Sequence, residues 1–497
     1  MEALFDGSLT LPTVILLIGA LGLALGFEFV NGFHDTANAV ATVIYTHTLK
    51  PTVAVVWSGC WNFLGVLTST GAVAFGIVAL LPVELIVNVG SGAGFAMVFA
   101  LLVSAIVWNL GTWYLGLPAS SSHTLIGSIM GVGLMNSWMS SDRAFGEGVN
   151  WGKAQEVGMA LLLSPLVGFI CAALLLILAR ILVKNPELYA EPPKDKAPPL
   201  WIRGILMLTC TGVSFAHGSN DGQKGMGLVM LILIGIVPAT YALNLDTEAS
   251  VLAEIAASAR TTSASFAPLA KDVPAPGQDE AVEVLSQFLR TGKALPATYA
   301  ALAVKDAAIA AKVTGIKAMS EVPAEARRTL RTDIYLVSES ITKLAKQPDG
   351  LPAADKKALT ELRDKLKGVT SFIPVWVKVA IALALGLGTM IGWKRIVVTV
   401  GEKIGKAHLT YAQGASAELV AMATIGAADI FGLPVSTTHV LSSGVAGAMF
   451  ANHSGLQKET LRNLLLAWVL TLPVCVFLGA TLFAAGLMLV SKVFGLS

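Results

Sequence analysis

The amino-acid sequence predicts an all-α polytopic membrane protein that also carries a helical, water-soluble insert. Three observations support this fold class. Of the 497 residues, 55% are hydrophobic and only 13% are charged, which is about half the charged share of soluble domains. The apolar residues form runs near the roughly 20 residues that a helix needs to cross the hydrocarbon core. Half of the charged residues fall in one quarter of the chain, between residues 246 and 370.

The first apolar block, residues 1–243, is expected to hold most of the membrane segments. Its shorter runs, at 36–46 and 124–139, are typical of half-helices or re-entrant segments. No basic n-region precedes the first run, so we do not expect a cleaved signal peptide. Long apolar runs predict spanning helices at 11–30, 52–82, 93–115, 156–182, 202–217 and 225–243.

The second apolar block, residues 372–497, predicts long helices at 372–393, 415–431 and 462–490 and a shorter segment at 434–451. Together the two blocks predict about 10–12 membrane segments, some of them broken or re-entrant.

The insert, residues 244–371, contains 17 of the 34 Lys and Arg residues and 16 of the 32 Asp and Glu residues. It is rich in Ala, Lys and Glu, which predicts helices. We find no catalytic pattern in it and expect a regulatory or spacer domain.

Charge and cysteine content exclude several classes of protein. The net charge of +2, without a basic block, gives no electrostatic footprint for binding nucleic acid. The four cysteines form neither a CxxC pair nor a disulfide framework, and we interpret them as small core or lipid-facing residues. Basic residues cluster in two loops, at 180–203 and 394–406, which we expect on the cytoplasmic side. The side of the insert stays open.

Two short motifs each occur twice in the chain. NGFHDTAN at 31–38 matches HGSNDGQK at 217–224 through the shared skeleton G-x-x-D. GLPASSSHTL at 116–125 matches GLPVSTTHVL at 432–441 through G-L-P-x-S-[ST]-[ST]-H-x-L. Duplicated motifs in a polytopic protein predict an inverted-repeat transporter whose halves surround one site near the bilayer midplane.

The hydroxyl-rich motif favours an anion. Gly and Pro in G-L-P break a helix, and the polar residues after them would begin a new helix, where free N–H groups attract anions. The hydroxyl groups add donors there without a charge that must be desolvated. The structural alternative is that such hydroxyls only bond neighbouring helices. His123 and His439 are interpreted as braces of these loops, with a proton-relay role as the alternative.

The acidic motif requires a cation. Asp35 and Asp221 lie in apolar surroundings, and intramembrane carboxylates are functional candidates by default. They would repel an anion unless H⁺, Na⁺ or a divalent metal accompanies it. Asn38 and Asn220 offer amides to either ligand, and Glu28 lies two helical turns before Asp35. A structural ion pair between Asp221 and Lys224, three residues on, is the alternative for the second acid.

The motifs resemble those of a known family. GFHDTANAVAT at 32–42, GLPASSSHTLIG at 116–127, HGSNDGQKG at 217–225 and GLPVSTTH at 432–439 are similar to the signatures of the inorganic phosphate transporter (Pit) family. The bacterial low-affinity members, which also carry a helical insert, are the most similar. GTMIGW at 388–393 and TYAQG at 410–414 extend the resemblance across both blocks.

The resemblance implies a secondary active symporter that imports inorganic phosphate across the inner membrane, coupled to H⁺. It further implies transport of phosphate as a neutral complex with Mg²⁺ or another divalent cation. Na⁺ coupling is the alternative, although His34 and Lys224 replace amides of the Na⁺-coupled pattern. We expect no tightly bound cofactor and a homodimer in the lipid bilayer.

The residues implied in the site fall into two groups. Cation or proton coupling would centre on Asp35 and Asp221, which are also the expected metal ligands, with His34 and Glu28 beside them. Phosphate contacts would come from Ser120, Ser121, Ser122, Thr124, Ser436, Thr437, Thr438, Asn38, Asn220, Gln413 and Ser416.

Other functions are disfavoured. In an intramembrane enzyme, Ser121 and His123 would serve as nucleophile and base, but two residues apart on a helix they point to different faces. A passive anion channel would not place two carboxylates in the anion's path. A primary pump would need a nucleotide-binding loop, and the sequence has no G-x-x-x-x-G-K-[ST] motif.

Overall fold

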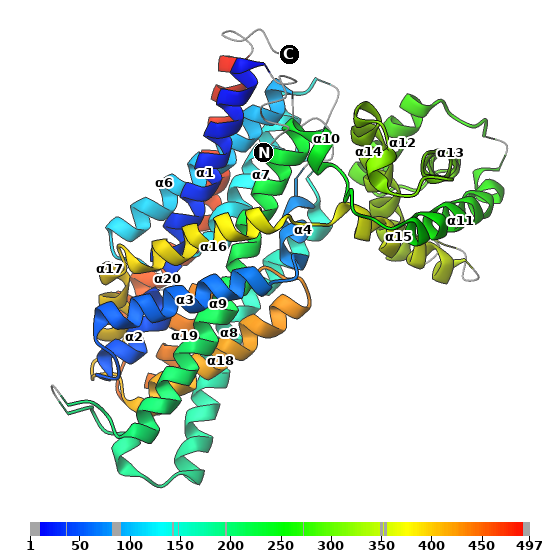
Figure 1. Cartoon of the computed structure of the whole chain (residues 1–497). Coiled ribbons are helices and arrows are strands. Elements are labelled where there is room, and N and C mark those ends of the chain that lie inside the picture. Colours follow the sequence, from blue (N-terminus) through cyan, green and yellow to red (C-terminus); the bar gives the residue numbers. More distant parts are fainter. Residues whose placement is uncertain are drawn as a thin grey trace.

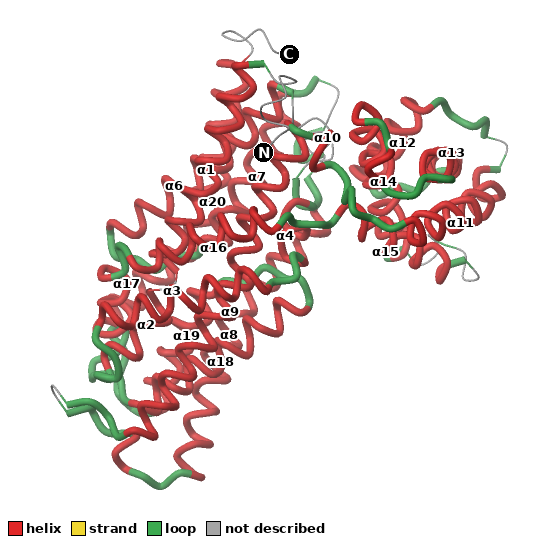
Figure 2. Tube along the Cα trace, viewed as in Figure 1, coloured by secondary structure: helices red, strands yellow, loops and turns green. Residues whose placement is uncertain are grey.

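The computed structural model is built of helices joined by loops (Figure 2). It describes residues 10–490 except 36, 82–90, 142–143, 148, 194–195, 272, 348–350 and 352–354, and it leaves out the side chains of residues 37, 38 and 153. Six of the described helices are long and apolar enough to cross a membrane. They cover residues 11–45, 51–68, 92–114, 154–182, 200–236 and 458–489.

The first half of the membrane body contains α1 (Leu11–Asp35), α2 (Ala37–Tyr45), α3 (Pro51–Thr68), α4 (Ala72–Val78), α6 (Gly92–Tyr114), α7 (Ser121–Met139) and α8 (Trp151–Leu182). The second half contains α9 (Leu200–Ile236), α10 (Pro238–Tyr241), α16 (Val375–Met390), α17 (Lys394–Val398), α18 (Tyr411–Ile430), α19 (Thr437–Ala451) and α20 (Lys458–Leu489). The helices pack into one elongated bundle (Figure 1).

The two halves exchange their packing partners. Helix α7 of the first half lies along α20 of the second, and α19 of the second lies along α8 of the first. In the same way α3 packs on α9 and α16 packs on α1. Glycines allow the close approach: a Cβ on Gly131 would lie 2.1 Å from the Val476 carbonyl oxygen, and one on Gly447 would lie 2.1 Å from that of Phe169. Both halves therefore contribute to one interior.

One expected division of the chain is wrong. The runs at 202–217 and 225–243 are not two spans, because the polar motif between them lies inside the single 37-residue helix α9. The motif's side chains are buried in the bundle, where they bond to α3, to α18 and to the loop before α19. Since these side chains have partners inside the bundle, the helix continues through the motif. Conversely, the run at 52–82 breaks after α3, where Gly71 adopts φ 88° before α4.

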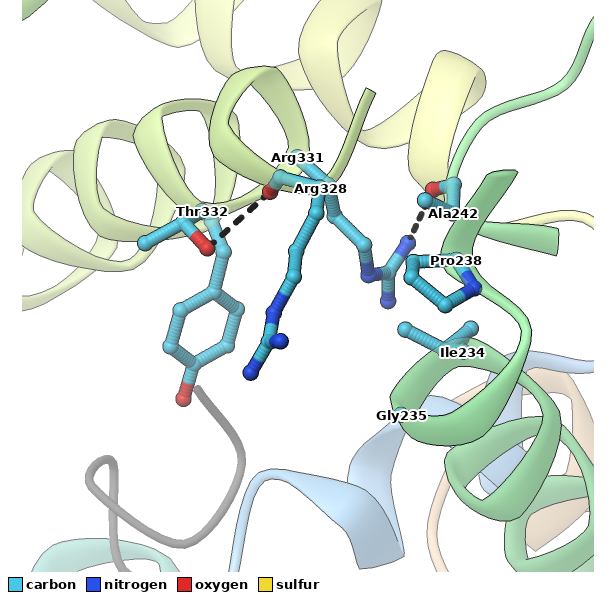
Figure 3. Close-up of a pocket in the computed structure, with 8 residues that line it drawn as sticks. Ile234, Gly235, Pro238, Ala242, Arg328, Arg331 and Thr332 are labelled. Atoms are coloured by element: carbon cyan, nitrogen blue, oxygen red, sulfur yellow. Dashed lines mark hydrogen bonds between the residues drawn. The ribbon is translucent and has the colours of Figure 1, made fainter. Parts of the chain in front are cut away.

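The insert forms a helical body of its own beside one end of α9 (Figure 1). It contains α11 (Ala249–Phe266), α12 (Gln278–Thr291), α13 (Pro296–Val313), α14 (Ala324–Ala345) and α15 (Lys356–Thr370), packed around an apolar core. Figure 3 shows its junction with the membrane body, where Arg331 donates from Nη1 to the Ala242 carbonyl at 2.8 Å. Within the insert, the same nitrogen also donates to the Thr370 carbonyl at 3.0 Å. The basic loop that precedes α9 lies at the other end of this helix.

Candidate functional site

The two hydroxyl-rich motifs begin two helices, as their sequence predicts. Gly116 (φ 67°) follows α6 and Gly432 (φ 64°) follows α18, and in this left-handed region glycine carries no steric cost. Ser120 then caps α7 by accepting a hydrogen bond from the His123 N–H at 3.2 Å, and Ser436 caps α19 through the His439 N–H at 3.1 Å. The two N-termini thus have matching construction, in which the cap hydroxyl accepts from one first-turn N–H group.

Asp35 joins both of these helix starts. It is the last residue of α1 and only 3% exposed. Ser121 of α7 donates to its Oδ2 at 2.5 Å, and Thr438 of α19 donates to its Oδ1 at 2.8 Å. His34 Nδ1 lies 2.9 Å from Oδ1, and its Nε2 lies 3.1 Å from the Thr112 hydroxyl. The first acid, the first serine cluster and the second threonine cluster therefore meet at one point.

Asp221 lies in the middle of α9 and is fully buried. Lys224, one turn further along, donates from Nζ to Asp221 Oδ1 at 2.5 Å. His217, one turn before, places Nε2 3.3 Å from Oδ2, and its Nδ1 lies 2.9 Å from Asn62 Oδ1. The ion pair with Lys224, which the sequence offered as the alternative reading of Asp221, is thus present.

Lys224 also connects the second acid to the hydroxyl motifs. Its Nζ donates to Ser122 Oγ at 2.5 Å and lies 3.4 Å from the Val435 carbonyl oxygen. Ser122 in turn donates to the same carbonyl at 2.9 Å. Both acids and both hydroxyl motifs are therefore linked in one buried network.

Three further predicted residues border this network. Thr437 is buried at the start of α19 and its Oγ1 has no hydrogen-bond partner among the described residues. Asn220 donates to the Leu433 carbonyl at 3.2 Å, whereas its Oδ1 lacks a partner within the same described set. These two buried polar atoms are therefore available to a ligand or to water. Thr124 instead bonds Asn109 Oδ1 (3.0 Å) and the Ser120 carbonyl (2.8 Å), which braces α7.

Other predicted residues contribute differently or are not described. Gln413 closes the N-terminus of α18, where its Oε1 accepts from the Thr410 N–H at 2.8 Å, and its Nε2 donates to Ser454 at 2.6 Å. Ser416 is buried on α18, and Glu28 is buried on α1, where Asn31 donates to it at 3.4 Å. The side chain of Asn38 lies outside the described residues.

The two motif histidines lie against each other with their rings tilted by 35°. The rings of His123 and His439 lie 4.6 Å apart between centroids, and His439 stacks on Trp468 at 4.1 Å. Trp468 donates from Nε1 to the Pro118 carbonyl at 2.9 Å. This stack joins the two G-L-P loops, as expected for braces.

Sequence reasoning missed two carboxylates on α18, of which Glu418 is buried and Asp429 is partly buried. Glu418 accepts hydrogen bonds from Thr42 and Thr209, and Asp429 accepts from Ser219 (2.6 Å) and from Gln223 (2.5 Å). Both acids lie within or beside an apolar run, so the rule that selected Asp35 would have selected them too. His217, which lies beside Asp221, was also missed, because its place in the repeated motif is the only sequence feature that marks it.

Asp35, His217 and Asp221 form a cluster, called here the acid cluster, that has the composition of a cation site. One ligand atom each from Asp35, His217 and Asp221 lies within 4.8 Å of the others. Two carboxylates and an imidazole suit a divalent metal such as Mn²⁺ or Zn²⁺, and the carboxylates alone suit H⁺, Na⁺ or Mg²⁺. The adjoining helix N-termini suit an oxyanion. The network can therefore bind an anion and a cation side by side.

Comparisons with known proteins agree with this chemistry. A family model described as "Phosphate transporter family" matches residues 31–479. The "Low-affinity inorganic phosphate transporter PitA" of Escherichia coli strain K12 is 43% identical over 97% of this chain and 99% of its own length. The "Probable low-affinity inorganic phosphate transporter" of Bacillus subtilis strain 168 is 28% identical over 94% and 96%. A solved structure, "The sodium-dependent phosphate transporter", shares the fold with a TM-score of 0.51 and 19% identity, over 95% of this chain and 98% of that one.

Proposed function

Because the chain belongs to the phosphate transporter family, we propose that it imports inorganic phosphate by symport with H⁺. It is a multi-pass protein of the inner membrane and a transporter, not an enzyme. The proposal covers the direction, the coupling ion and the residues that do the work. The observation that carries it is the meeting of Ser121 and Thr438, from two different helix starts, on the carboxylate of Asp35.

Coupling follows from competition for these hydroxyl groups. While Asp35 is ionised, it accepts hydrogen bonds from both Ser121 and Thr438, so neither is available to another anion. A proton on Asp35 removes the charge that holds them. Phosphate then accepts hydrogen bonds from the released hydroxyls and from first-turn N–H groups of α7 and α19. The cation thus prepares the anion's site, and the anion stabilises the protonated acid.

The unpartnered atoms of the site support the same proposal. Thr437 offers a hydroxyl donor to phosphate, and Asn220 Oδ1 can accept from a protonated phosphate oxygen. The loaded site carries little net charge, which reduces the cost of moving it through the membrane. We propose that the two halves are inverted repeats and that exposure of the site changes by movement of one half against the other.

Uptake into proteoliposomes tests this function. Purified protein is reconstituted, a pH gradient or a Na⁺ gradient is imposed separately at clamped membrane potential, and radiolabelled phosphate is followed. We expect accumulation driven by the pH gradient. Accumulation with neither gradient required, or none with either, would refute symport.

Two alternative forms of this proposal, which differ in the cation that is carried, have support of their own. The Asp35, His217 and Asp221 cluster favours phosphate carried as a complex with a divalent metal, which predicts that Mg²⁺ or Mn²⁺ raises uptake in the same assay. Carboxylate ligands also suit Na⁺, which is the ion that would replace H⁺ if only the Na⁺ gradient drives uptake.

A further inference from the structure

We propose that Lys224 is a tethered cation of the phosphate site, which neutralises Asp221 throughout the transport cycle. Only Asp35 then needs a cation that travels with the substrate. This inference rests on the proposed symport and assigns its charge balance. It also gives the two repeated acids different roles, although their motifs match.

Lys224 occupies the position that a bound cation would take. Its side chain is fully buried, and its ammonium is surrounded by oxygen atoms from three elements of the site: Asp221 Oδ1 at 2.5 Å, Ser122 Oγ at 2.5 Å and the Val435 carbonyl at 3.4 Å. A carboxylate, a hydroxyl and a main-chain carbonyl are the ligand types of an alkali or alkaline-earth ion. The ammonium is held by the chain and cannot be released with phosphate.

The first half of the site is built differently. In the repeated motif, residue 224 corresponds to Asn38, so an amide in one half corresponds to an ammonium in the other. Asp35 accepts hydrogen bonds from the hydroxyls of Ser121 and Thr438, whereas the direct partners of Asp221 are Lys224 and His217. A mobile cation can replace hydroxyl donors at Asp35, but at Asp221 it would have to displace a covalently attached charge.

Lys224 also acts on the anion. Ser122 belongs to the first hydroxyl motif and lies in the first turn of α7, so the Lys224 ammonium contacts this helix start. A buried positive charge there strengthens binding of an oxyanion by α7. Glu28 and His123 are further titratable groups near Lys224, and no hydrogen bond from Lys224 to either is found among the described residues.

Removal of the ammonium should add one carried cation. In Lys224→Gln, Asp221 is left as a buried carboxylate without its ion-pair partner, and neutrality then requires another cation with each phosphate. At clamped potential, a tenfold gradient of the coupling cation should therefore raise the equilibrium accumulation ratio of phosphate by about another tenfold over the wild type. The double variant Asp221→Asn/Lys224→Gln removes both charges and should return the ratio to the wild-type value.

Matched variants separate this role from a merely structural one. Lys224→Arg keeps the charge and should keep the wild-type accumulation ratio. The double variant Glu28→Gln/Lys224→Gln removes a different buried acid, so it should not restore the wild-type accumulation ratio. Asp221→Asn alone leaves the ammonium unpaired and should fail to accumulate phosphate. Each variant is first checked for monodispersity in detergent.

The outcomes are decisive. A wild-type ratio in Lys224→Gln overturns the inference. If Lys224→Gln is inactive, recovery in the Asp221→Asn double variant supports charge compensation, and an inactive but monodisperse double variant overturns it. Loss of gradient-driven uptake in the wild type would instead overturn the proposed symport itself.

Discussion

The hydroxyl group of Ser121 should affect phosphate and the coupling cation in opposite directions. Its Oγ donates to Asp35 Oδ2 at 2.5 Å in a buried site. A hydrogen bond to a charged group contributes about 1.5–3 kcal/mol, which corresponds to about 10–150-fold in an equilibrium constant. In the proposed cycle the same hydroxyl serves ionised Asp35 in the empty site and phosphate in the loaded site.

Ser121→Ala therefore has two expected effects. With the cation saturating, Asp35 is neutral and no longer uses the hydroxyl, so its loss weakens phosphate binding alone. The phosphate concentration for half-maximal uptake should rise about 10–150-fold. With the cation limiting, ionised Asp35 has lost one donor and binds the cation more tightly. The half-saturating cation concentration should fall by a similar factor. This concentration is measured at saturating phosphate, because weaker phosphate binding would otherwise mask the change.

Initial rates in proteoliposomes, over a grid of phosphate and cation concentrations, measure both quantities. Ser128→Ala is the matched control, because Ser128 lies on α7 two turns further on. Among the described residues, its hydroxyl accepts from Ser104 (2.6 Å) and donates to the Thr124 carbonyl (2.8 Å), and it has no bond to Asp35. This substitution should leave both constants within a factor of about three. Shifts of the two constants in the same direction, or equal effects of the two substitutions, would refute the exchange of hydroxyls between Asp35 and phosphate.

Three more predictions follow from single residues. Asp35→Asn should abolish phosphate accumulation while the protein still inserts in the membrane; undiminished growth on phosphate in a strain lacking other importers would contradict this. Burial raises the pKa of Asp306 in the insert to about 8, so the folded insert holds a proton that the unfolded chain loses near pH 4. The free energy of unfolding of the insert should fall by about 1.4 kcal/mol per pH unit between about pH 4 and pH 8 and level off above pH 8. Hydrogen exchange of the full chain measures this pH dependence, and Asp306→Asn should flatten it. Gly131→Ala should lower the melting temperature in detergent, because its Cβ meets the Val476 carbonyl, whereas Gly158→Ala, with no atom within 4 Å, should not.

Those parts of the fold that depend on local chemistry could be predicted from the sequence. G-L-P followed by three hydroxyl residues specifies a helix end, a left-handed glycine and a new N-cap, and both copies have this structure. The site's composition was predictable for a related reason. Carboxylates and hydroxyls that repeat within apolar runs must find partners, and the partners available inside a bundle are each other.

What could not be predicted depends on packing between distant segments. The motif around Asp221 reads as a break between two spans, yet α9 continues through it because α3 covers it closely: a Cβ on Gly218 would lie 2.2 Å from the Asn62 carbonyl oxygen. Gln413 closes the start of its own helix, but its Nε2 also donates to Ser454, 41 positions away, which no local pattern indicates. The bond from Lys224 to Ser122 joins residues 102 positions apart, and no local pattern encodes it.

The arrangement also explains why neither ligand should move alone. With the cation alone, Asp35 is neutral and the hydroxyls of Ser121 and Thr438 are left buried without an anion, at about 1–3 kcal/mol for each unsatisfied group. With phosphate alone, the anion would lie beside an ionised Asp35 that still competes for the same donors. In the proposed cycle, the hydroxyls of Ser121 and Thr438 have an anionic partner only in the empty site, where it is ionised Asp35, and in the doubly loaded site, where it is phosphate. Ser121 and Thr438 lie in the first turns of α7 and α19, which pack on α20 and α8 respectively. In the proposed cycle, a change in the charge of Asp35 would therefore act on the starts of both helix pairs at once.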